Sequence, residues 1–170
     1  MSMAIQLRRL LLRITEPLAF APPLLARVVI GTIFLHSGWG KLHNLDKVAA
    51  FFASLGIPHP ELQAPFVACV ELGCGALVLV GLATRFAAIP LIGTMAVALG
   101  TALAPKIKDL QSLFALAESL YVVLLVGLVV GGAGALSLDR AIARAIDQRA
   151  GSVAKMRSSA GRPTTAGTAT

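Results

Sequence analysis

Four apolar stretches, each long enough to cross a lipid bilayer, constrain this chain more than any other feature. They cover residues 24–42, 65–83, 86–104 and 113–130. Each approaches the roughly 20 residues that span a hydrocarbon core about 30 Å thick. Hydrophobic residues make up 56% of the chain and charged residues only 14%. Since lipid cannot hydrogen-bond the backbone, we predict an all-α fold, a four-helix transmembrane bundle over 24–139.

The N-terminal segment, residues 1–23, has two interpretations. The run at 7–21 carries Arg8 and Arg9 at its start and ends in Ala-Phe-Ala, a pattern typical of a cleaved signal peptide. Arg13, Glu16 and Pro17 interrupt that run. The interruptions favour a basic interfacial segment whose arginines lie among lipid phosphates, and the signal peptide remains the alternative.

Two short amphipathic helices are expected outside the spans. The first covers 44–56, ends at Gly56 and is too polar to cross, so we expect it as a lid on the outer membrane surface. The second covers 140–150 on the cytoplasmic side. Residues 151–170 have no apolar period and are predicted to be disordered. The apolar face of the first helix comprises Val48, Phe51, Phe52 and Leu55.

The net charge of +7 and the pI near 10.3 could suggest nucleic-acid binding. The arginines and lysines, however, lie at the ends of the spans, where basic residues set membrane orientation. Most of them fall on one side when both termini are placed in the cytoplasm. We therefore predict a multi-pass protein of the cell (inner) membrane with cytoplasmic termini, whose partner is the bilayer and not nucleic acid.

The first span carries a line of residues at alternating steps of four and three. Such steps keep all members within about 40° of one line down a helix. Its two glycines would allow a neighbouring helix to approach closely. Trp39 lies off the line near the outer rim, where indole rings commonly anchor. The line comprises Arg27, Gly31, Phe34, Gly38 and Lys41.

These residues also carry a family resemblance. The chain reads Arg27-x3-Gly31-x6-Gly38-x2-Lys41, then Phe51-Phe52-Ala53-Ser54-Leu55-Gly56-Ile57-Pro58, Val70-Glu71-Leu72, Gly81-Leu82-Ala83-Thr84-Arg85 and Ser137-Leu138-Asp139. In order and spacing this resembles the DoxX family of small four-span membrane proteins, over 24–139. Family members often have a histidine directly before the glycine that matches Gly38. Here that position is Ser37, and the histidine is His36, one helical step of about 100° away.

The resemblance implies a function linked to redox chemistry. Some relatives are linked to a membrane-bound oxidoreductase that passes electrons from thiosulfate to quinone, or to a terminal quinol oxidase complex. Others are similar to partners of soluble redox proteins in oxidative-stress defence. We therefore expect an accessory or quinone-handling component, with quinone as its cofactor, redox-protein partner subunits and a homo-oligomer. A non-catalytic membrane anchor and a small-solute transporter are the alternatives.

Depth along the spans brings several polar groups to one level. At about 1.5 Å per residue, His36, Glu71 and Glu118 lie roughly 4 to 6 Å outside the midplane. Carboxylates at such depths are expected to face the bundle interior, where Lys41 is the available cation. This network could fix helix register only, handle protons for a quinone headgroup, or line a solute pathway.

From this level we derive the candidate site. Lys41, Glu71 and Glu118 are the predicted catalytic residues, and His36, Trp39 and Tyr121 are predicted to bind the cofactor. Tyr121 lies three residues after Glu118 on the same helix face and could donate its hydroxyl to that carboxylate.

A structural clasp is predicted at the cytoplasmic edge. There the Asp139 carboxylate could accept hydrogen bonds from Arg27 or Arg85. No set of Cys and His ligands points to a bound metal, and no glycine-rich loop points to a nucleotide. Catalysis would therefore need a mobile cofactor or a partner subunit.

Overall fold

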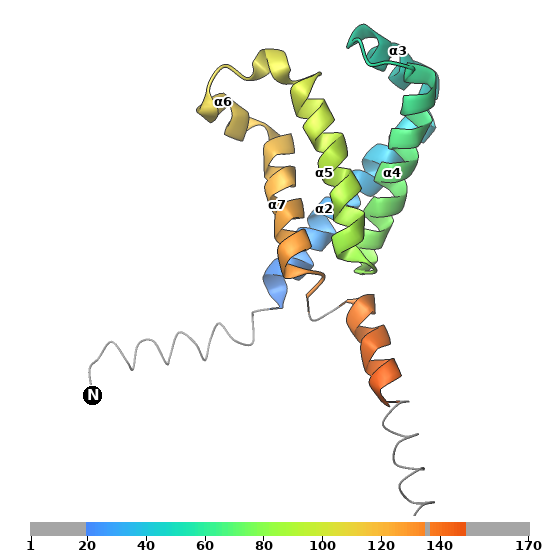
Figure 1. Ribbon diagram of the computed structural model, residues 1–170, viewed down its shortest axis with the longest axis vertical. Coiled ribbons are helices and arrows are strands. Elements are labelled where there is room, and N and C mark those ends of the chain that lie inside the picture. The colour runs from blue at the N-terminus through green and yellow to red at the C-terminus, as the bar shows by residue number, and fades with distance from the viewer. Residues whose placement is uncertain (1–19, 135–136, 149–170) are drawn as a thin grey trace, which may run out of the picture.

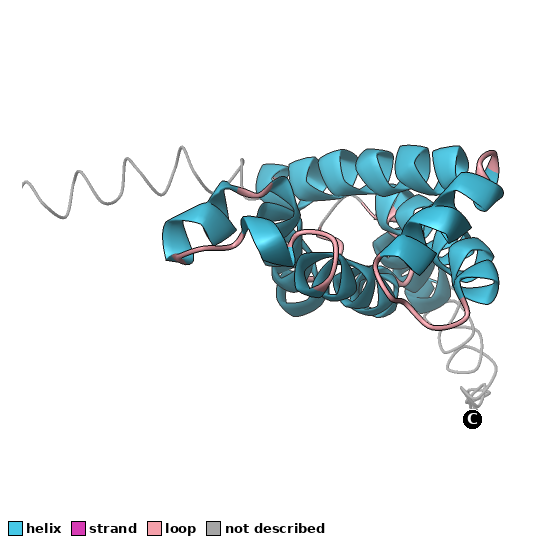
Figure 2. Ribbon diagram, turned by 90° about the horizontal axis from the view of Figure 1, so that it is seen from above, coloured by secondary structure: helices cyan, strands magenta, loops and turns pink. Residues whose placement is uncertain are grey.

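The computed structural model describes residues 20–134 and 137–148, and helices are the only regular elements within these ranges, as the view from above shows (Figure 2). The four long helices are α2 (Ala21–Leu42), α4 (Pro60–Val80), α5 (Thr84–Gly100) and α7 (Ala117–Gly131). They confirm the predicted helical bundle. The predictions for 1–19 and for the tail from 151 lie outside the described residues.

Prolines set where the first two long helices begin. Pro22 and Pro23 lie in the first turn of α2, and Pro60 opens α4. Proline suits this position because its fixed φ is helical and its missing N–H would have no partner there. Both helices therefore begin earlier than predicted. Each exceeds 20 residues and is long and apolar enough to cross a membrane.

The fourth apolar stretch is broken, which corrects the prediction of one span over 113–130. Residues Leu110–Ala115 form the short helix α6, and α7 begins only at Ala117. Leu116 between them is extended, with ψ at 134°. The Ser119 hydroxyl donates to the Leu113 carbonyl over 2.7 Å, so the break keeps a hydrogen bond. At 15 residues, α7 extends about 22 Å and is shorter than the hydrocarbon core.

Each long helix packs against two of the others, and α2 also contacts α7 (Figure 1). α2 lies against α4, while α5 contacts both α4 and α7. The shared core draws side chains from all four helices, which fixes their mutual rotation. Its buried members are Ile30, Phe34, Val78, Ala87, Ala88, Leu91, Met95, Leu125 and Leu128.

Glycines bring α2 and α4 into close contact, as predicted for Gly31 and Gly38. A Cβ at Gly31 would lie 2.7 Å from Leu79 Cβ. A Cβ at Gly38 would lie 2.8 Å from the Ala68 carbonyl oxygen. Any larger side chain at these positions would push the two helices apart, so the glycines set the helix spacing.

Short elements lie at the two ends of the bundle (Figure 1). At one end, called the α3 end here, lie α3 (Leu45–Ser54), the single 3₁₀ turn η2 (Ala104–Lys106) and α6. α3 packs on α4 and is followed by Gly56 at φ 73°, which confirms the predicted helix with its glycine stop. At the opposite end, called the Arg85 end, residues 138–148 form the second predicted amphipathic helix.

Large apolar side chains cover the outside of the bundle. Phe86, Leu62 and Val130 are 79%, 72% and 74% exposed. A water-soluble monomer rarely exposes apolar surface so widely, whereas a bundle in lipid does. The distribution of side chains therefore agrees with a helical membrane bundle.

Candidate functional site

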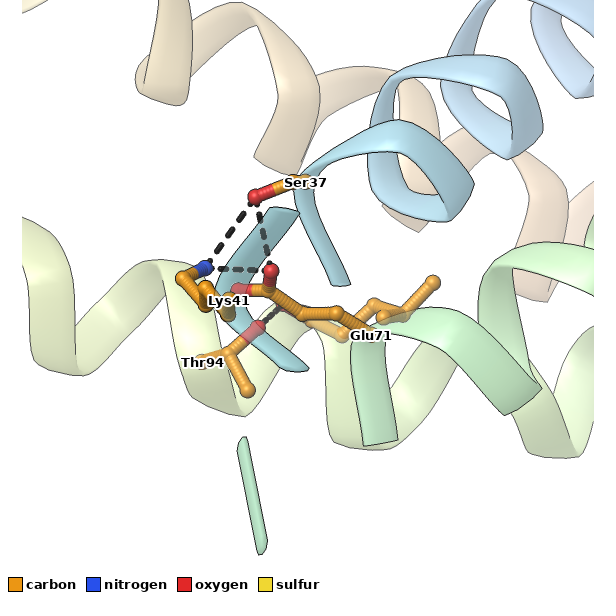
Figure 3. Close-up of polar contacts among 5 residues, drawn as sticks. Ser37, Lys41, Glu71 and Thr94 are labelled. Atoms are coloured by element: carbon orange, nitrogen blue, oxygen red, sulfur yellow. Dashed lines mark hydrogen bonds and ion pairs between the residues drawn. The ribbon is translucent and has the colours of Figure 1, made fainter. Parts of the chain in front are cut away.

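One carboxylate oxygen is the centre of the main polar cluster (Figure 3). Glu71 on α4 forms an ion pair with Lys41 at the end of α2, through its Oε2. The Ser37 hydroxyl donates to the same oxygen over 2.8 Å, and Lys41 Nζ also donates to Ser37 Oγ over 3.1 Å. The three side chains thus form a closed triangle across the interface of α2 and α4.

Helix geometry explains the triangle. Ser37 and Lys41 are four residues apart on α2 and therefore lie on one face. The Glu71 side chain, only 2% exposed, reaches that face because glycines let the two helices approach. The other carboxylate oxygen, Oε1, has no hydrogen-bond partner among residues 20–134 and 137–148.

A cavity of about 690 Å³ opens beside this triangle at the α3 end. Both Lys41 and Glu71 line it, and we call it the Lys41 cavity. α3 and the following loop cover it from one side, as expected of a lid, and α4 and α5 form its other walls. Its walls are mainly apolar and include Phe51, Phe52, Leu55, Ile57, Phe66, Val67, Val70, Met95 and Val97.

The cavity has a buried polar corner and an apolar mouth. Lys41 is 26% exposed and Glu71 almost fully buried, so the charged pair lies at the inner side. Thr94 of α5, drawn beside the pair in Figure 3, lines the same cavity but donates its hydroxyl to the Leu91 carbonyl at 2.8 Å. Phe51 and Phe66 are 51% and 65% exposed and border the opening.

Comparison with known proteins supports the family resemblance. Residues 23–104 match the family model described as DoxX, and they include most of α2, the cluster and the walls of the cavity. The chain carries a DoxX domain. The motif 137–139, which was part of the predicted resemblance, lies beyond the matched residues.

Proteins similar to this chain are named as membrane proteins or as an oxidoreductase. The chain is 37% identical over 86 residues to the "Uncharacterized membrane protein Rv3486" of Mycobacterium tuberculosis. The aligned region covers 50% of this chain and 51% of that protein. The chain is 40% identical over 76 residues to the "Putative oxidoreductase CatD" of Bacillus subtilis, covering 42% and 55% of the two chains.

A third relative matches over more of its length. The chain is 29% identical over 127 residues to the "Inner membrane protein YphA" of Escherichia coli, covering 69% of this chain and 87% of that one. With the first two relatives the shared region spans only about half of their length. No solved structure matches the chain significantly. The protein is thus a membrane protein with a DoxX domain.

Glu118 does not join the cluster in the DoxX domain. It lies half-buried in the first turn of α7, does not line the Lys41 cavity and has no hydrogen bond or ion pair to Lys41 or Glu71. The predicted network of Lys41 with two carboxylates is corrected to Lys41, Glu71 and Ser37. Counting residues along a span predicted the depth of Glu118 but did not establish which helix face carries it.

The three residues predicted to bind a cofactor all lie away from the Lys41 cavity. His36 is exposed on α2, and Trp39 is 58% exposed with its ring 4.5 Å from that of His43. The Tyr121 ring packs edge-on against Phe34, 6.4 Å between centroids. No hydrogen bond joins Tyr121 to Glu118 within the described part of the chain.

The residues of the predicted clasp gather at the Arg85 end, and each of them makes a hydrogen bond to a backbone group. Asp139 Oδ1 accepts from the Ala83 N–H at 3.0 Å. The buried Arg27 donates to the Ala133 carbonyl at 2.5 Å, and Arg85 donates to the Val130 carbonyl at 3.2 Å. These bonds join the turn between α4 and α5 to Asp139, α2 to the turn after α7, and the start of α5 to the end of α7.

Ser37 is the cluster member that sequence reasoning missed as a site residue. Its signal was present, because Ser37 lies four residues before Lys41 and directly before Gly38. It occupies the position where family members often carry histidine. The aromatic walls of the Lys41 cavity had no comparable signal, since apolar residues in a membrane protein are ordinarily lipid-facing or core.

Proposed function

We propose that this DoxX protein is a quinone-handling component of a membrane-associated redox system, and that the Lys41 cavity receives the quinone headgroup. The observation that carries the proposal is a buried, ion-paired carboxylate at the inner corner of an apolar cavity with an aromatic mouth. Burying an ionisable side chain within a membrane protein is costly, and such a residue marks a candidate functional site.

The shape and lining of the cavity fit a lipid-soluble ligand with a polar head. Its volume, about 690 Å³, lies within the usual range for small-molecule sites. The exposed Phe51 and Phe66 at its mouth would meet lipid acyl chains, so a ligand dissolved in the bilayer could enter without crossing water. A hydrophilic solute would find little to replace its hydration on these walls.

The polar corner offers both kinds of partner that a quinone oxygen needs. Lys41 can donate a hydrogen bond to a quinone carbonyl oxygen, and Glu71 Oε1 can accept one from a quinol hydroxyl. A bound quinone would supply two-electron, two-proton redox chemistry. Glu71 would hold the proton during transfer, while Ser37 keeps the carboxylate in place by its bond to Oε2.

One relative is named "Putative oxidoreductase CatD", and this name supports a redox role. Partner subunits, among them soluble redox proteins, and self-association are part of the proposal. A non-catalytic anchor predicts a cavity that retains no quinone, and a solute carrier predicts flux in proteoliposomes. The experiment below distinguishes quinone binding from both alternatives.

The test is retention of quinone by the purified protein. Wild type, Glu71→Gln and Glu118→Gln would be reconstituted with ubiquinone or menaquinone, purified again in detergent and analysed by mass spectrometry. Glu118→Gln is the matched control because it removes a half-buried carboxylate outside the cavity. We expect retention in wild type and Glu118→Gln, and at least a tenfold loss in Glu71→Gln.

A second pair of variants covers the possibility that Glu71→Gln does not fold. A side chain at Gly93 would enter the Lys41 cavity, whereas one at Gly127 would point into open space, and neither would meet another atom within 4 Å. Gly93→Leu should abolish retention and Gly127→Leu should not. Absence of quinone from reconstituted wild type, or equal retention in all folded variants, would overturn the proposal.

The orientation is also part of the proposal. With both termini cytoplasmic, the Arg85 end faces the cytoplasm and the Lys41 cavity opens toward the outer leaflet. Reporter fusions at residue 149 and within the loop near Lys106 would test this. We expect cytoplasmic signal from the first fusion and external signal from the second.

A further inference from the structure

We propose a second binding site, independent of the redox role, at the Arg85 end: a cavity that holds the phosphate group of an anionic phospholipid. The cavity is an open hollow of about 580 Å³ between the start of α5, the turn at 131–134 and the helix at 138–148. Arg85 and Arg140 line it from opposite segments, together with Phe86, Gly132 and Asp139. We call it the Arg85 cavity.

Arg85 is held in place across the turn that follows α7. Its Nη2 donates to the Val130 carbonyl in the last turn of α7, at 3.2 Å. A Cβ at Gly132 would lie 3.1 Å from Arg85 Nε, so the glycine, at φ 74°, leaves room for the guanidinium. A guanidinium has five N–H donors, and the bond to Val130 uses one of them. The exposed remainder can bind a phosphate oxygen.

Arg140 supplies the second guanidinium. Its backbone N–H donates to Ser137 Oγ at 3.3 Å, which sets the start of the helix at 138–148. The Arg140 side chain is exposed and makes no hydrogen bond or ion pair with the residues that the structure describes. It therefore lines the cavity as an available donor.

The balance of charge in the cavity favours an anion. Asp139 is the acidic residue among those lining it, and its Oδ1 already accepts the Ala83 N–H. Two guanidinium groups, those of Arg85 and Arg140, line the cavity beside this one carboxylate. A third arginine, Arg27, donates to the carbonyl of Ala133, which is another lining residue. Arginine pairs recognise phosphate through several parallel hydrogen bonds.

Apolar side chains beside the guanidinium groups indicate a lipid as the source of the phosphate. Phe86 lines the cavity and is 79% exposed, and the neighbouring Val130 is 74% exposed. Leu138 and Ile142 on the adjoining helix are 47% and 45% exposed. A phospholipid would place its phosphate between the arginines and its acyl chains along these surfaces, an arrangement typical of basic pockets at membrane edges.

The test compares two arginines on the same helix. Arg140→Gln removes a cavity residue, and Arg144→Gln removes the same charge one turn later, at an exposed position outside the cavity. Each purified protein would be equilibrated with phosphatidylglycerol and phosphatidylcholine in neutral detergent, and bound lipid counted by native mass spectrometry. We expect wild type and Arg144→Gln to retain phosphatidylglycerol preferentially, and Arg140→Gln to lose about tenfold of that binding.

Several outcomes would overturn the proposal. Equal losses in Arg140→Gln and Arg144→Gln would indicate general attraction by a basic surface. No preference of wild type for phosphatidylglycerol over phosphatidylcholine would exclude a site for an anionic lipid. Binding of inorganic phosphate with the same sensitivity to Arg140→Gln, but without lipid retention, would assign the cavity to a free phosphate and overturn the lipid assignment.

Discussion

Ser37 donates its hydroxyl to Glu71 Oε2 over 2.8 Å, and Lys41 pairs with the same oxygen. Both partners of the buried carboxylate therefore come from one face of α2. Both hydrogen bonds that the Glu71 carboxylate accepts from α2 are made by Oε2, so Oε1 is left without a partner among the described residues. It also ties the cluster to the helix spacing set by Gly31 and Gly38.

The ion pair should show strong coupling. Lys41→Met would leave Glu71 buried without its cation, and we expect a loss of about 2 to 3 kcal/mol in the free energy of unfolding in detergent. This is below the about 3 to 5 kcal/mol typical of a fully buried pair, since Lys41 is 26% exposed. The double variant Lys41→Met/Glu71→Met should recover part of that loss. Strictly additive effects would show that the two side chains do not interact.

The Ser37 hydroxyl should contribute measurably to stability. Ser37→Ala removes one donor from a charged, buried acceptor, which should cost about 1 to 2 kcal/mol. Ser54→Ala is the control, since its hydroxyl donates to the Phe51 carbonyl at an exposed position. That change should stay within about 0.5 kcal/mol. Equal losses in both variants would argue against a special role for Ser37.

Glycines on α2 should respond oppositely to alanine. At Gly38 the new Cβ would lie 2.8 Å from a backbone oxygen of α4, whereas at Gly40 it would meet nothing within 4 Å. We expect Gly38→Ala to destabilise the bundle by about 1 to 3 kcal/mol. Gly40→Ala should stabilise it by about 0.5 to 1 kcal/mol through helix propensity. Thermal unfolding of the two variants in the same detergent measures the difference.

The capping box at the start of α6 should make that helix sensitive to acid. Asp109 Oδ1 accepts from the Ser112 N–H at 2.7 Å, and this bond, with the Ser112 side chain, lowers the pKa of the exposed carboxyl. A lowered folded-state pKa means that the stabilisation is complete above the unfolded value, about 3.9, and is lost as pH falls through the folded value.

Hydrogen exchange at the Ser112 amide, corrected for its intrinsic pH dependence, measures this effect. Protection in wild type should decline below about pH 4. Asp109→Asn keeps a good N-cap without a charge, so its protection should change little over the same range. A similar decline in both proteins would mean that the carboxylate is not responsible.

Much of the fold was predictable because hydrophobic length and helical periodicity are local properties of a sequence. The apolar stretches predicted the four long helices, and Gly56 predicted the end of α3. The prediction failed at Leu116, because an apolar run does not reveal a residue that leaves the helical conformation. The hydrogen bond from Ser119 to the Leu113 carbonyl spans this break and is a contact of the folded chain.

What the sequence alone determined is a helical membrane protein with a line of glycines and one lysine on its first long helix. Composition and spacing suffice for that. Only the tertiary structure decided that Lys41 pairs with Glu71 and not with Glu118, and that Ser37 replaces His36 in the cluster. Depth along a span follows from counting residues, whereas the side to which a helix turns depends on its packing against its neighbours. The Lys41 cavity exists for the same reason, since its walls come from α3, α4 and α5 and meet only when these helices are packed together.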